Sequence, residues 1–320
     1  MPLPSGSVTV GFDIGGTNLR GAAVDAEGHI IDTTQVPTPG TAEELETAVT
    51  EIVSHYRRRQ QVTGVGLAVA GFLDPECTTV RFAPHLPWRD APVRDILQEQ
   101  LGLPVTLEHD ANAAAWGEYR FGAARGSRIW VLFAVGTGIG GALMIEGKLY
   151  RGAYGTAPEF GHLTVVRDGR PCSCGKFGCL ERYCSGTALV DTAREIIVAG
   201  ADDTYGLAAD YRESGSGELT GRVIMDAARG DDPVAVAAVR DYTAWLGQGL
   251  SVVADVLDPE LIVIGGGVST DADLWLEDAR SHFTGAIVGA GHRPLARLAT
   301  AELGADAGMI GVADLARGDT

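Results

Sequence analysis

Two short glycine-rich segments of the sequence have the residue types that bind phosphate groups. Gly15-Gly16-Thr17-Asn18 and Gly136-Thr137-Gly138 each follow an apolar stretch, turn through glycine with a threonine, and enter another apolar stretch. Because glycine has no Cβ, successive backbone N–H groups can approach phosphate oxygens closely, and the threonine hydroxyl adds a donor. A lone segment of this kind is equally compatible with a plain hairpin turn, so the phosphate-binding interpretation depends on the presence of two such segments.

A third glycine segment and one acidic residue strengthen the phosphate-binding interpretation. Gly265-Gly266-Gly267 follows another apolar stretch, and Asp13 stands at the end of the first one, where it could orient a water of bound Mg²⁺. The sequence contains no Gly-x-x-x-x-Gly-Lys-Ser/Thr motif, which excludes a P-loop site. Gly136-x-Gly138-x-Gly140 leads into a strand instead of a helix, which argues against a dinucleotide-binding Rossmann site.

A cluster of cysteines has the spacing of a zinc site. His162 is followed by Cys172, Cys174 and Cys179, and glycines at 175 and 178 allow the segment to curl around an ion. One histidine and three cysteines form the ligand set of a closed, tetrahedral structural zinc site. Disulfides are the alternative, but Cys172 and Cys174 are too close in sequence to pair easily, and a cytoplasmic chain keeps its thiols reduced.

Three carboxylates and one histidine have the chemistry to bind a ligand with several hydroxyl groups. Asp110 stands where an expected strand ends and an alanine-rich helix begins, so it either caps that helix or presents a carboxylate to a cleft. Glu159 and Glu181 flank the cysteine segment, and a bound zinc ion would fix both near His162. A zinc-bound histidine points its second ring nitrogen at another partner, which could be a substrate hydroxyl.

The composition limits the class of partner. The chain has 320 residues, 45% of them hydrophobic and 21% charged, which is typical of a globular protein of about two domains. Its 25 basic residues face 42 acidic ones, for a net charge of −17, which excludes a broad nucleic-acid-binding surface. The first six residues contain no basic leader region, and glycines interrupt the apolar run over 129–145, which excludes a membrane span there. We therefore expect a cytoplasmic protein that holds anionic ligands locally, through backbone N–H groups, helix N-termini or a metal ion.

Alternating strand and helix patterns predict the elements that position these residues. Strands are expected over 8–13, 19–24, 29–36, 65–70 (closed by Gly71), 104–107, 128–135, 142–146, 261–264 and 295–299. Helices are expected over 42–60, 91–100, 112–121, 186–199, 221–228, 233–257 and 271–283 and from about 307 onward, with 210–217 as a polar loop. The strand–turn–strand pattern around the two glycine–threonine segments recurs about one domain length apart. This recurrence predicts two related α/β domains that clamp a nucleotide.

The chain resembles the ROK family of sugar kinases, most closely its bacterial glucokinases. The resemblance covers essentially the whole chain, from Asp13-Ile14-Gly15-Gly16-Thr17 to Ile264-Gly265-Gly266-Gly267-Val268. Its most specific part is Glu159-Phe160-Gly161-His162 followed by Cys172-x-Cys174-Gly175-x-x-Gly178-Cys179-Leu180-Glu181. The resemblance implies a two-domain, actin-like ATPase fold of the ribonuclease H-like α/β class, with the active site in the interdomain cleft. We expect a smaller domain over 1–110 and 306–320, and a larger domain with the zinc loop over 111–305.

The resemblance also implies ATP-dependent phosphorylation of glucose to glucose 6-phosphate, with Mg²⁺ on the phosphates. Asp110 would be the general base on the sugar hydroxyl, a role that suits a carboxylate because a primary alcohol is a poor nucleophile. The implied sugar ligands are Gly71, His109, Asp110, Glu159, His162 and Glu181. The implied ATP ligands are Asp13, Gly15, Gly16, Thr17, Asn18, Gly136, Thr137, Gly138, Gly265, Gly266 and Gly267, and the implied zinc ligands are His162, Cys172, Cys174 and Cys179.

Two positions depart from the family pattern. The family usually has asparagine directly before the catalytic aspartate, where this chain has His109, and often lysine where this chain has Asn18. Neither change touches the base or the zinc ligands, so kinase activity is still expected. His109 leaves the sugar open, and kinases for N-acetylmannosamine, fructose or mannose remain alternatives.

A non-catalytic sugar sensor is the alternative from a different class of protein. Repressors of this fold carry a winged-helix domain before the first Gly-Gly-Thr segment, whereas only 12 residues precede Asp13 in this sequence. Retention of Thr17, Thr137 and Asp110 together also favours an enzyme. The resemblance further suggests a homodimer or tetramer, and the apolar stripe on the helix over 233–257 is either an interface or part of the core.

Overall fold

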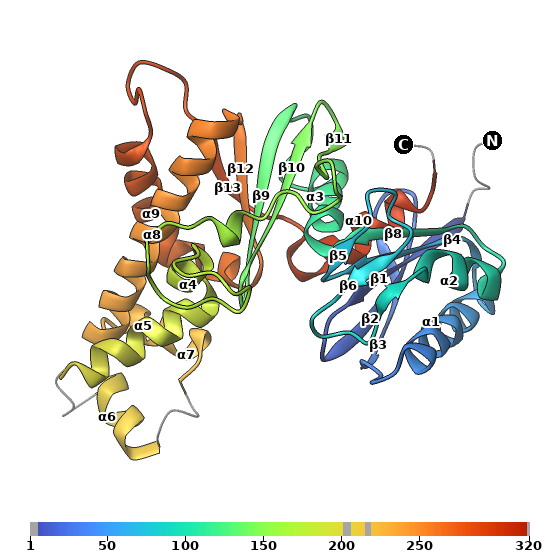
Figure 1. The fold of residues 1–320 in the computed structure, drawn as a ribbon, viewed down its shortest axis with the longest axis horizontal. Helices are drawn as coiled ribbons and strands as arrows, with labels where there is room; N and C mark the ends of the chain where they lie inside the picture. Colours follow the sequence, from blue (N-terminus) through green and yellow to red (C-terminus); the bar gives the residue numbers. More distant parts are fainter. Residues whose placement is uncertain (1–5, 201–205, 215–218, 319–320) are drawn as a thin grey trace. The chain divides into compact units, whose positions relative to one another are not determined.

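A computed structural model describes residues 6–200, 206–214 and 219–318 of the chain. The chain divides into two compact units, each drawn in Figure 1. Unit 1 comprises Met1–Leu132, Ala142–Pro158 and Ala301–Thr320. Unit 2 comprises Phe133–Gly141 and Glu159–Thr300. Within the described ranges, none of the helices pairs enough length with enough apolar character to cross a bilayer.

A five-stranded sheet in the order β3-β2-β1-β4-β8 forms the centre of unit 1. The strands are β1 (Ser7–Ile14), β2 (Asn18–Val24), β3 (Ile30–Pro37), β4 (Gln61–Val69) and β8 (Val105–His109). The first three strands pair antiparallel, and β4 and β8 run parallel to β1. Because β1, β4 and β8 are parallel, the residues that follow their carboxyl ends meet at one edge of the sheet.

Helices cover both faces of this sheet. They are α1 (Ala42–Arg57), α2 (Val93–Leu101), α3 (Asp110–Phe121) and α10 (Ala307–Leu315). On one face, alternate β1 residues such as Val10 and Phe12 join the core formed with α1 and α2. On the other face, α10 packs so closely that a Cβ at Gly11 would lie 2.0 Å from Met309 O, and one at Gly66 would lie 2.1 Å from Val312 O. The two glycines therefore set how near α10 can approach the sheet.

A small second sheet in unit 1 was not predicted from the sequence. Its strands are β5 (Phe72–Leu73), β6 (Val80–Phe82) and β7 (Arg89–Ala91), paired in that order. Elements of two or three residues are too short to show the alternation that marks a strand. The buried Asp74 closes the first turn, because its carboxylate accepts hydrogen bonds from the backbone N–H groups of Thr78 and Thr79.

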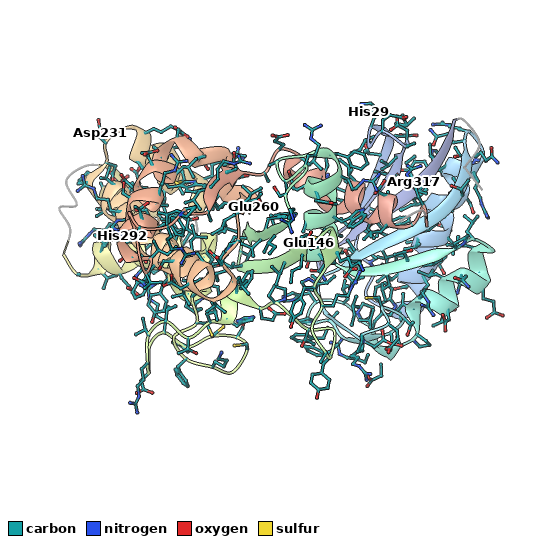
Figure 2. All side chains as sticks on the ribbon, turned by 90° about the horizontal axis from the view of Figure 1, so that it is seen from above. His29, Glu146, Asp231, Glu260, His292 and Arg317 are labelled. Atoms are coloured by element: carbon teal, nitrogen blue, oxygen red, sulfur yellow. The ribbon has the colours of Figure 1, made fainter. Side chains whose placement is uncertain are left out.

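The C-terminal segment is tied to the first hairpin of unit 1. Arg317, just after α10, donates to Val24 O at 2.6 Å, where β2 ends and leads to the turn that holds His29. Figure 2 labels both His29 and Arg317 on this part of the chain. The position of α10 against the sheet is thus held by hydrogen bonds as well as by packing.

The other large sheet has the order β11-β10-β9-β12-β13. Its strands are β9 (Ile129–Val135), β10 (Ile139–Ile145), β11 (Lys148–Leu149), β12 (Leu261–Gly265) and β13 (Arg297–Thr300). The remaining α-helices are α4 (Glu181–Cys184), α5 (Gly186–Val198), α6 (Gly206–Ser214), α7 (Gly221–Arg229), α8 (Pro233–Leu257) and α9 (Ala272–Ala286). Short 3₁₀ helices are η1 (Phe160–His162), η3 (Gly267–Asp271) and η4 (Gly304–Asp306).

The expected polar loop over 210–217 is wrong where the structure describes it. Gly206–Ser214 forms α6, and residues 215–217 lie outside the described residues. Residues 1–5, for which no basic leader region was expected, also lie outside them. Two contacts explain the helix. Leu207 is buried, and its N–H donates to Asp232 Oδ2 at 2.9 Å, so a side chain 25 residues away satisfies the start of α6.

The apolar stripe on α8 belongs to the core. Val239, Tyr242, Leu246, Leu250 and Val253 are all buried within the chain. This helix has the predicted bounds, and its N-terminus is capped by Asp232 and followed by Pro233. The stripe therefore lends no support to the expected homo-oligomer, which stays a prediction.

The two units differ in their boundaries from the domains expected at 1–110 and 111–305. Unit 1 also takes in residues 111–132, 142–158 and 301–305. The reason is close packing of α3 on α10. A Cβ at Gly311 would lie 1.8 Å from Ala113 O, and one at Gly117 would lie 2.6 Å from Ala307 O. The expected active-site cleft between the domains stays a prediction.

Replacing Glu118 by Gln is expected to destabilise unit 1. Glu118 is fully buried in α3, and its two carboxylate oxygens accept the backbone N–H groups of Ala123, Glu302 and Leu303 at 2.8–3.1 Å. An amide has one acceptor oxygen, so its NH₂ group would face at least one of these donors. We expect a loss of about 1–3 kcal/mol in the free energy of unfolding, measured by urea denaturation. An unchanged midpoint would contradict this role for Glu118.

Candidate active site

One row of residues crosses the unit 1 sheet at its carboxyl edge. Ile14 on β1 is paired with Val69 on β4, which is paired with His109 on β8. Asp13 directly precedes this row and Asp110 directly follows it. Since neighbouring strands are about 4.8 Å apart, β1 and β8 are separated by roughly 10 Å. The register therefore brings both predicted carboxylates to the same edge.

Asp110 is the first residue of α3 and keeps a carboxylate oxygen available. The N-cap residue is His109, whose side chain makes no capping hydrogen bond. Asp110 Oδ1 accepts the N–H of Ala111 at 2.7 Å and lies 3.3 Å from His109 Nε2. The side chain is 43% exposed, and within the described chain Oδ2 has no hydrogen-bond partner. Asp110 therefore presents a carboxylate whose Oδ2 is available, and it does not serve to cap the helix.

Asp13 lies in an acidic environment. Burial raises the pKa of its carboxyl above the usual value, and the negative charges of Asp110 and Asp306 raise it further. Arg20, whose Nη1 lies 3.9 Å from Asp13 Oδ2, lowers the pKa but is itself paired with Asp306 at 2.5 Å. Carboxylates that share an edge in this way suit a divalent cation, because an ion such as Mg²⁺ prefers oxygen ligands.

The Gly15–Asn18 segment forms the turn between β1 and β2. Gly15 N–H donates to Asn18 O at 3.1 Å, and Thr38 Oγ1 donates to Gly15 O at 2.6 Å. Gly16 and Thr17 are exposed, and their backbone N–H groups are not paired with other backbone groups of the described chain. The turn is thus held from behind while two donors stay open, as phosphate binding requires.

Two of the predicted ligand positions in unit 1 also have structural roles. A Cβ at Gly71 would lie 2.7 Å from Phe82 O, so glycine allows the chain leaving β4 to pass the small sheet. Asn18 Oδ1 accepts a hydrogen bond from Gln35 Nε2 at 3.1 Å, which links β2 to β3. These contacts give both residues a role in the fold, independent of ligand binding.

The Gly136–Gly138 turn of unit 2 lies against the N-terminus of α5. Gly136 O accepts the N–H of Gly186 at 2.7 Å, and Thr137 O accepts the hydroxyl of Thr187 at 2.8 Å. Gly265-Gly266-Gly267 lies against the same turn, since a Cβ at Gly266 would be 2.3 Å from Val135 O. The structure therefore brings two of the predicted glycine segments together beside a helix N-terminus, which favours anions. The sequence analysis did not predict that the N-terminus of α5 would contribute to anion binding. Ser185, a typical N-cap residue, could have indicated it.

The cysteine segment brings four ligand atoms together in unit 2. The candidate ligand atoms of His162, Cys172, Cys174 and Cys179 all lie within 4.8 Å of one another. His162 Nδ1 is 3.7 Å from Cys172 Sγ, and the sulfurs of Cys174 and Cys179 are also 3.7 Å apart. Zinc–sulfur and zinc–nitrogen bond lengths give a tetrahedron with edges of roughly 3.5–3.8 Å. The donor set and its spacing therefore fit zinc.

Two glutamates flank the ring of His162. Glu159 Oε2 lies 4.0 Å from Nε2, on the side away from the cysteines, and Glu181 Oε1 lies 3.7 Å from Nδ1. Glu181 also accepts a hydrogen bond from Cys172 Sγ at 3.1 Å, and its other oxygen lies 3.4 Å from the N–H of Ile139. Glu181 thus connects the four-ligand cluster to the strand that follows the Gly136–Gly138 turn. The structure brings together Glu159, His162 and Glu181 as the sequence predicted.

Comparison with known proteins identifies relatives along the whole chain. The profile of the ROK family matches residues 9–319. The glucokinase of Streptomyces coelicolor is 42% identical, over 97% of this chain and 98% of the relative. A crystal structure of a ROK family glucokinase from Streptomyces griseus in complex with glucose and AMPPNP has a TM-score of 0.85 and 43% identity, covering 98% of this chain and all of the other. A ROK hexokinase from Thermus thermophilus has a TM-score of 0.77 and 32% identity, over 97% and 98% of the two chains.

The predicted fold class is confirmed by these matches and by the strand orders of the two sheets. The antiparallel β1–β3 meander followed by the parallel strands β4 and β8 is the arrangement of an actin-like ATPase domain. The chain belongs to the ROK family.

Proposed function

We propose that this protein transfers the γ-phosphoryl group of ATP to glucose and releases glucose 6-phosphate. The observation that carries the proposal is the carboxyl edge of the unit 1 sheet. There a carboxylate with an available oxygen, Asp110, shares an edge with a glycine turn that has open N–H donors, at Gly16 and Thr17. A phosphoryl-transfer enzyme needs these two functions above all, since its catalysis consists mainly of positioning and charge stabilisation.

Asp110 acts as the general base. It takes the proton of the sugar's primary hydroxyl as that oxygen attacks the γ-phosphorus and the bond from this phosphorus to the bridging oxygen of ADP breaks, so that ADP leaves. His109 Nε2, which lies 3.3 Å from Asp110 Oδ1, holds this carboxylate in place and contributes to hydroxyl recognition together with Gly71. Glu159 and Glu181 bind further sugar hydroxyls beside the free nitrogen of His162.

The proposed ATP ligands are Asp13, the Gly15–Asn18 turn and the segments Gly136–Gly138 and Gly265–Gly267. Asp13 would help to hold Mg²⁺, which would supply positive charge to the phosphates. Because the protein has a net charge of −17, an ATP site in it needs a source of positive charge.

Zinc is held by His162, Cys172, Cys174 and Cys179 and has a structural role. All four ligands come from one stretch of 18 residues that contains little regular structure. Zinc supplies the cross-link that fixes this stretch, and with it the orientation of the His162 ring between the two glutamates.

The cytoplasm is the proposed location, and the state of the thiols supports it. All five cysteines are free, including Cys184, which is buried. Reduced thiols are typical of a compartment in which disulfides do not persist.

A coupled ADP-release assay with Mg·ATP tests the proposed function. We would measure turnover with glucose, mannose, fructose, N-acetylglucosamine and N-acetylmannosamine. Preferred turnover of glucose is expected. Failure of zinc-replete, folded protein to turn over any of these sugars would contradict the kinase assignment and favour a sugar sensor.

The second candidate is a kinase for another hexose, and His109 is the observation that favours it. This imidazole is 25% exposed beside the proposed base, so it offers the sugar a larger and more rigid partner than an amide. We expect His109→Asn to change the ratio of kcat/KM between glucose and mannose by about tenfold while KM for ATP stays nearly constant. The ratio is measured in the same assay, and an unchanged ratio would remove His109 from sugar selection.

A further inference from the structure

Glu108 is a buried carboxylate that directly precedes the dipeptide His109-Asp110. It is the penultimate residue of β8, and its side chain is 2% exposed. An ionised carboxylate is costly to bury unless charged or hydrogen-bonding partners surround it. The residues that bind the Glu108 carboxylate therefore indicate its role.

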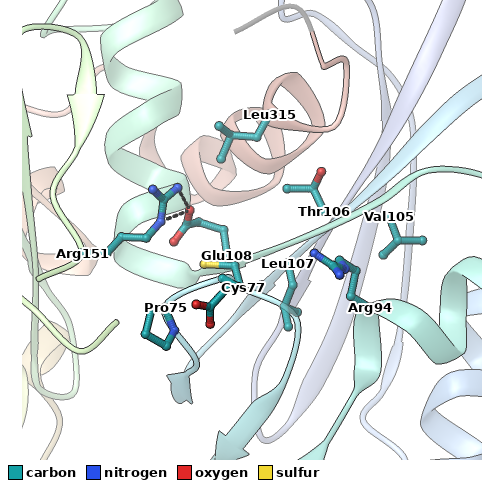
Figure 3. Close-up of a pocket in the computed structure, with 10 residues that line it drawn as sticks. Pro75, Cys77, Arg94, Val105, Thr106, Leu107, Glu108, Arg151 and Leu315 are labelled. Atoms are coloured by element: carbon teal, nitrogen blue, oxygen red, sulfur yellow. Dashed lines mark hydrogen bonds and ion pairs between the residues drawn. The ribbon is translucent and has the colours of Figure 1, made fainter. Parts of the chain in front are cut away.

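One oxygen of Glu108 is bound by a single guanidinium group. Arg151, from the segment after β11, donates to Oε2 through Nε at 3.0 Å and through Nη2 (Figure 3). Burial alone would lower the pKa of Arg151, but the hydrogen bonds and charge of Glu108 outweigh it and raise the pKa above its usual value. The nearby Cys77 does not compete as an anion, because burial and the charge of Glu108 raise its pKa to about 12.

The other oxygen of Glu108 holds both sides of Asp110. Oε1 accepts the backbone N–H of His109 at 3.0 Å and the side-chain amide of Asn112 at 3.0 Å. These two residues bracket Asp110, one at the N-cap of α3 and the other in its first turn. Because the N-cap side chain makes no capping bond, Glu108 is the group that ties the end of β8 to the start of α3.

The orientation of the Asn112 side chain is energetically unfavourable in one respect. The residue is 4% exposed, and its Oδ1 is buried without a hydrogen-bond partner in the described chain. An unpaired buried acceptor is destabilising, so a strong interaction must hold the amide in this orientation. The bond from its Nδ2 to the charged Oε1 of Glu108 is that interaction.

We propose that Glu108 is a positioning residue for Asp110, and that Arg151 keeps the Glu108 side chain oriented for that role. The proposal rests on the proposed function, in which Asp110 is the general base. Glu108 fixes the backbone on either side of the base, so a displaced Glu108 moves the base relative to the hydroxyl it deprotonates. Misplacement of a reacting group by about 1 Å can cost roughly 10²-fold in rate.

A cavity beside the ion pair allows Arg151 to be tested by chemical complementation. Its volume is about 260 Å³, and its lining includes Cys77, Thr106, Glu108 and Arg151 (Figure 3). Truncation of Arg151 to alanine would enlarge this cavity beside Glu108. A free guanidinium ion could then occupy the position of the lost group, next to Glu108 Oε2.

The first experiment compares two matched variants, Glu108→Gln and Glu118→Gln. Both remove a buried carboxylate that accepts at least one backbone N–H and is tied to α3, but only Glu108 lies beside Asp110. For Glu108→Gln we expect kcat to fall by about 10–100-fold, with KM for glucose within about twofold of wild type. For Glu118→Gln we expect a lower unfolding midpoint with kcat within about twofold. Equal kcat values in the two variants would overturn the proposal, because they would indicate a purely structural role.

The second experiment measures kcat of Arg151→Ala with and without guanidinium chloride at low millimolar concentration. We expect a kcat loss similar to that of Glu108→Gln and partial recovery with guanidinium, but none with sodium chloride at equal ionic strength. Wild type and Glu118→Gln should not respond. No recovery, in a variant that melts like wild type, would overturn the role of Arg151. This test also decides the proposal if Glu108→Gln does not fold.

The Asp110→Asn variant separates this proposal from the proposed function. If Asp110→Asn keeps near-normal turnover, the base assignment fails and Glu108 has no base to position. If Asp110→Asn is inactive while Glu108→Gln behaves like Glu118→Gln, the proposed function stands and the positioning role is refuted.

Discussion

Asp110→Asn is expected to lower kcat by about 10²–10⁴-fold, which is the contribution typical of a general base. The asparagine side chain has nearly the same shape and can still accept the N–H of Ala111 through its oxygen, as Asp110 Oδ1 does at 2.7 Å. It cannot take a proton from the sugar hydroxyl. The fold and the affinity for glucose should therefore persist while the chemical step fails.

Steady-state kinetics and isothermal titration calorimetry with glucose distinguish these effects. A matched control is Asp95→Asn, because that carboxylate is 63% exposed on α2 and makes no contact with the proposed site. The control should keep the turnover and glucose affinity of wild type. Turnover of Asp110→Asn within a few-fold of wild type would remove Asp110 from the role of base.

Cys174→Ala is expected to cause the second largest loss, through zinc. Cys174 is the most exposed of the four proposed ligands, so its removal creates little cavity in the core. Its Sγ lies 3.7 Å from the sulfur of Cys179, along one edge of the ligand cluster. Since binding of structural zinc contributes directly to folding, losing one of four ligands should release the metal and loosen the segment around His162. We expect substoichiometric zinc, a lower melting temperature and a KM for glucose raised at least tenfold.

Metal analysis, thermal melting and glucose kinetics on the same preparation test this prediction. Cys184→Ala is the matched control, because Cys184 is a buried thiol outside the four-ligand cluster. It should keep one zinc per chain even if it is less stable. Stoichiometric zinc in Cys174→Ala would show that this ligand assignment is wrong.

Local patterns predicted the parts of the protein whose interactions are local. The cluster of His162 and three cysteines could be predicted from spacing because three cysteines within eight residues, with glycines between them, can come together without help from the rest of the fold. The helix α8 could be bounded to the residue, since Asp232 and Pro233 mark its start and the apolar period runs unbroken to Leu257. The glycine turns after β1 and β9 were likewise visible from glycine flanked by apolar stretches.

Elements stabilised from a distance escaped prediction. The helix α6 depends on Asp232, which accepts the N–H of Leu207 across 25 residues of sequence. The small sheet of β5, β6 and β7 depends on pairing between strands too short to carry a pattern. Residues 111–132 join unit 1, and Gly117 and Gly311 let α3 and α10 pack closely there, a contact that leaves no periodic signal in the sequence.

Residue type and short spacing were enough to predict phosphate-binding turns, a zinc site and a general base after a strand, because each prediction depends on residues that are close in the sequence. Which of these candidate groups lie near one another depends on the folded chain. Strand register sets Ile14, Val69 and His109 in one row and so brings Asp13 and Asp110 to one edge. Burial pairs Glu108 with Arg151, 43 residues away, directly before the turn that leads to Asp110. Register and burial are properties of the folded chain as a whole, since a buried charge finds its partner by three-dimensional proximity and not by distance in sequence.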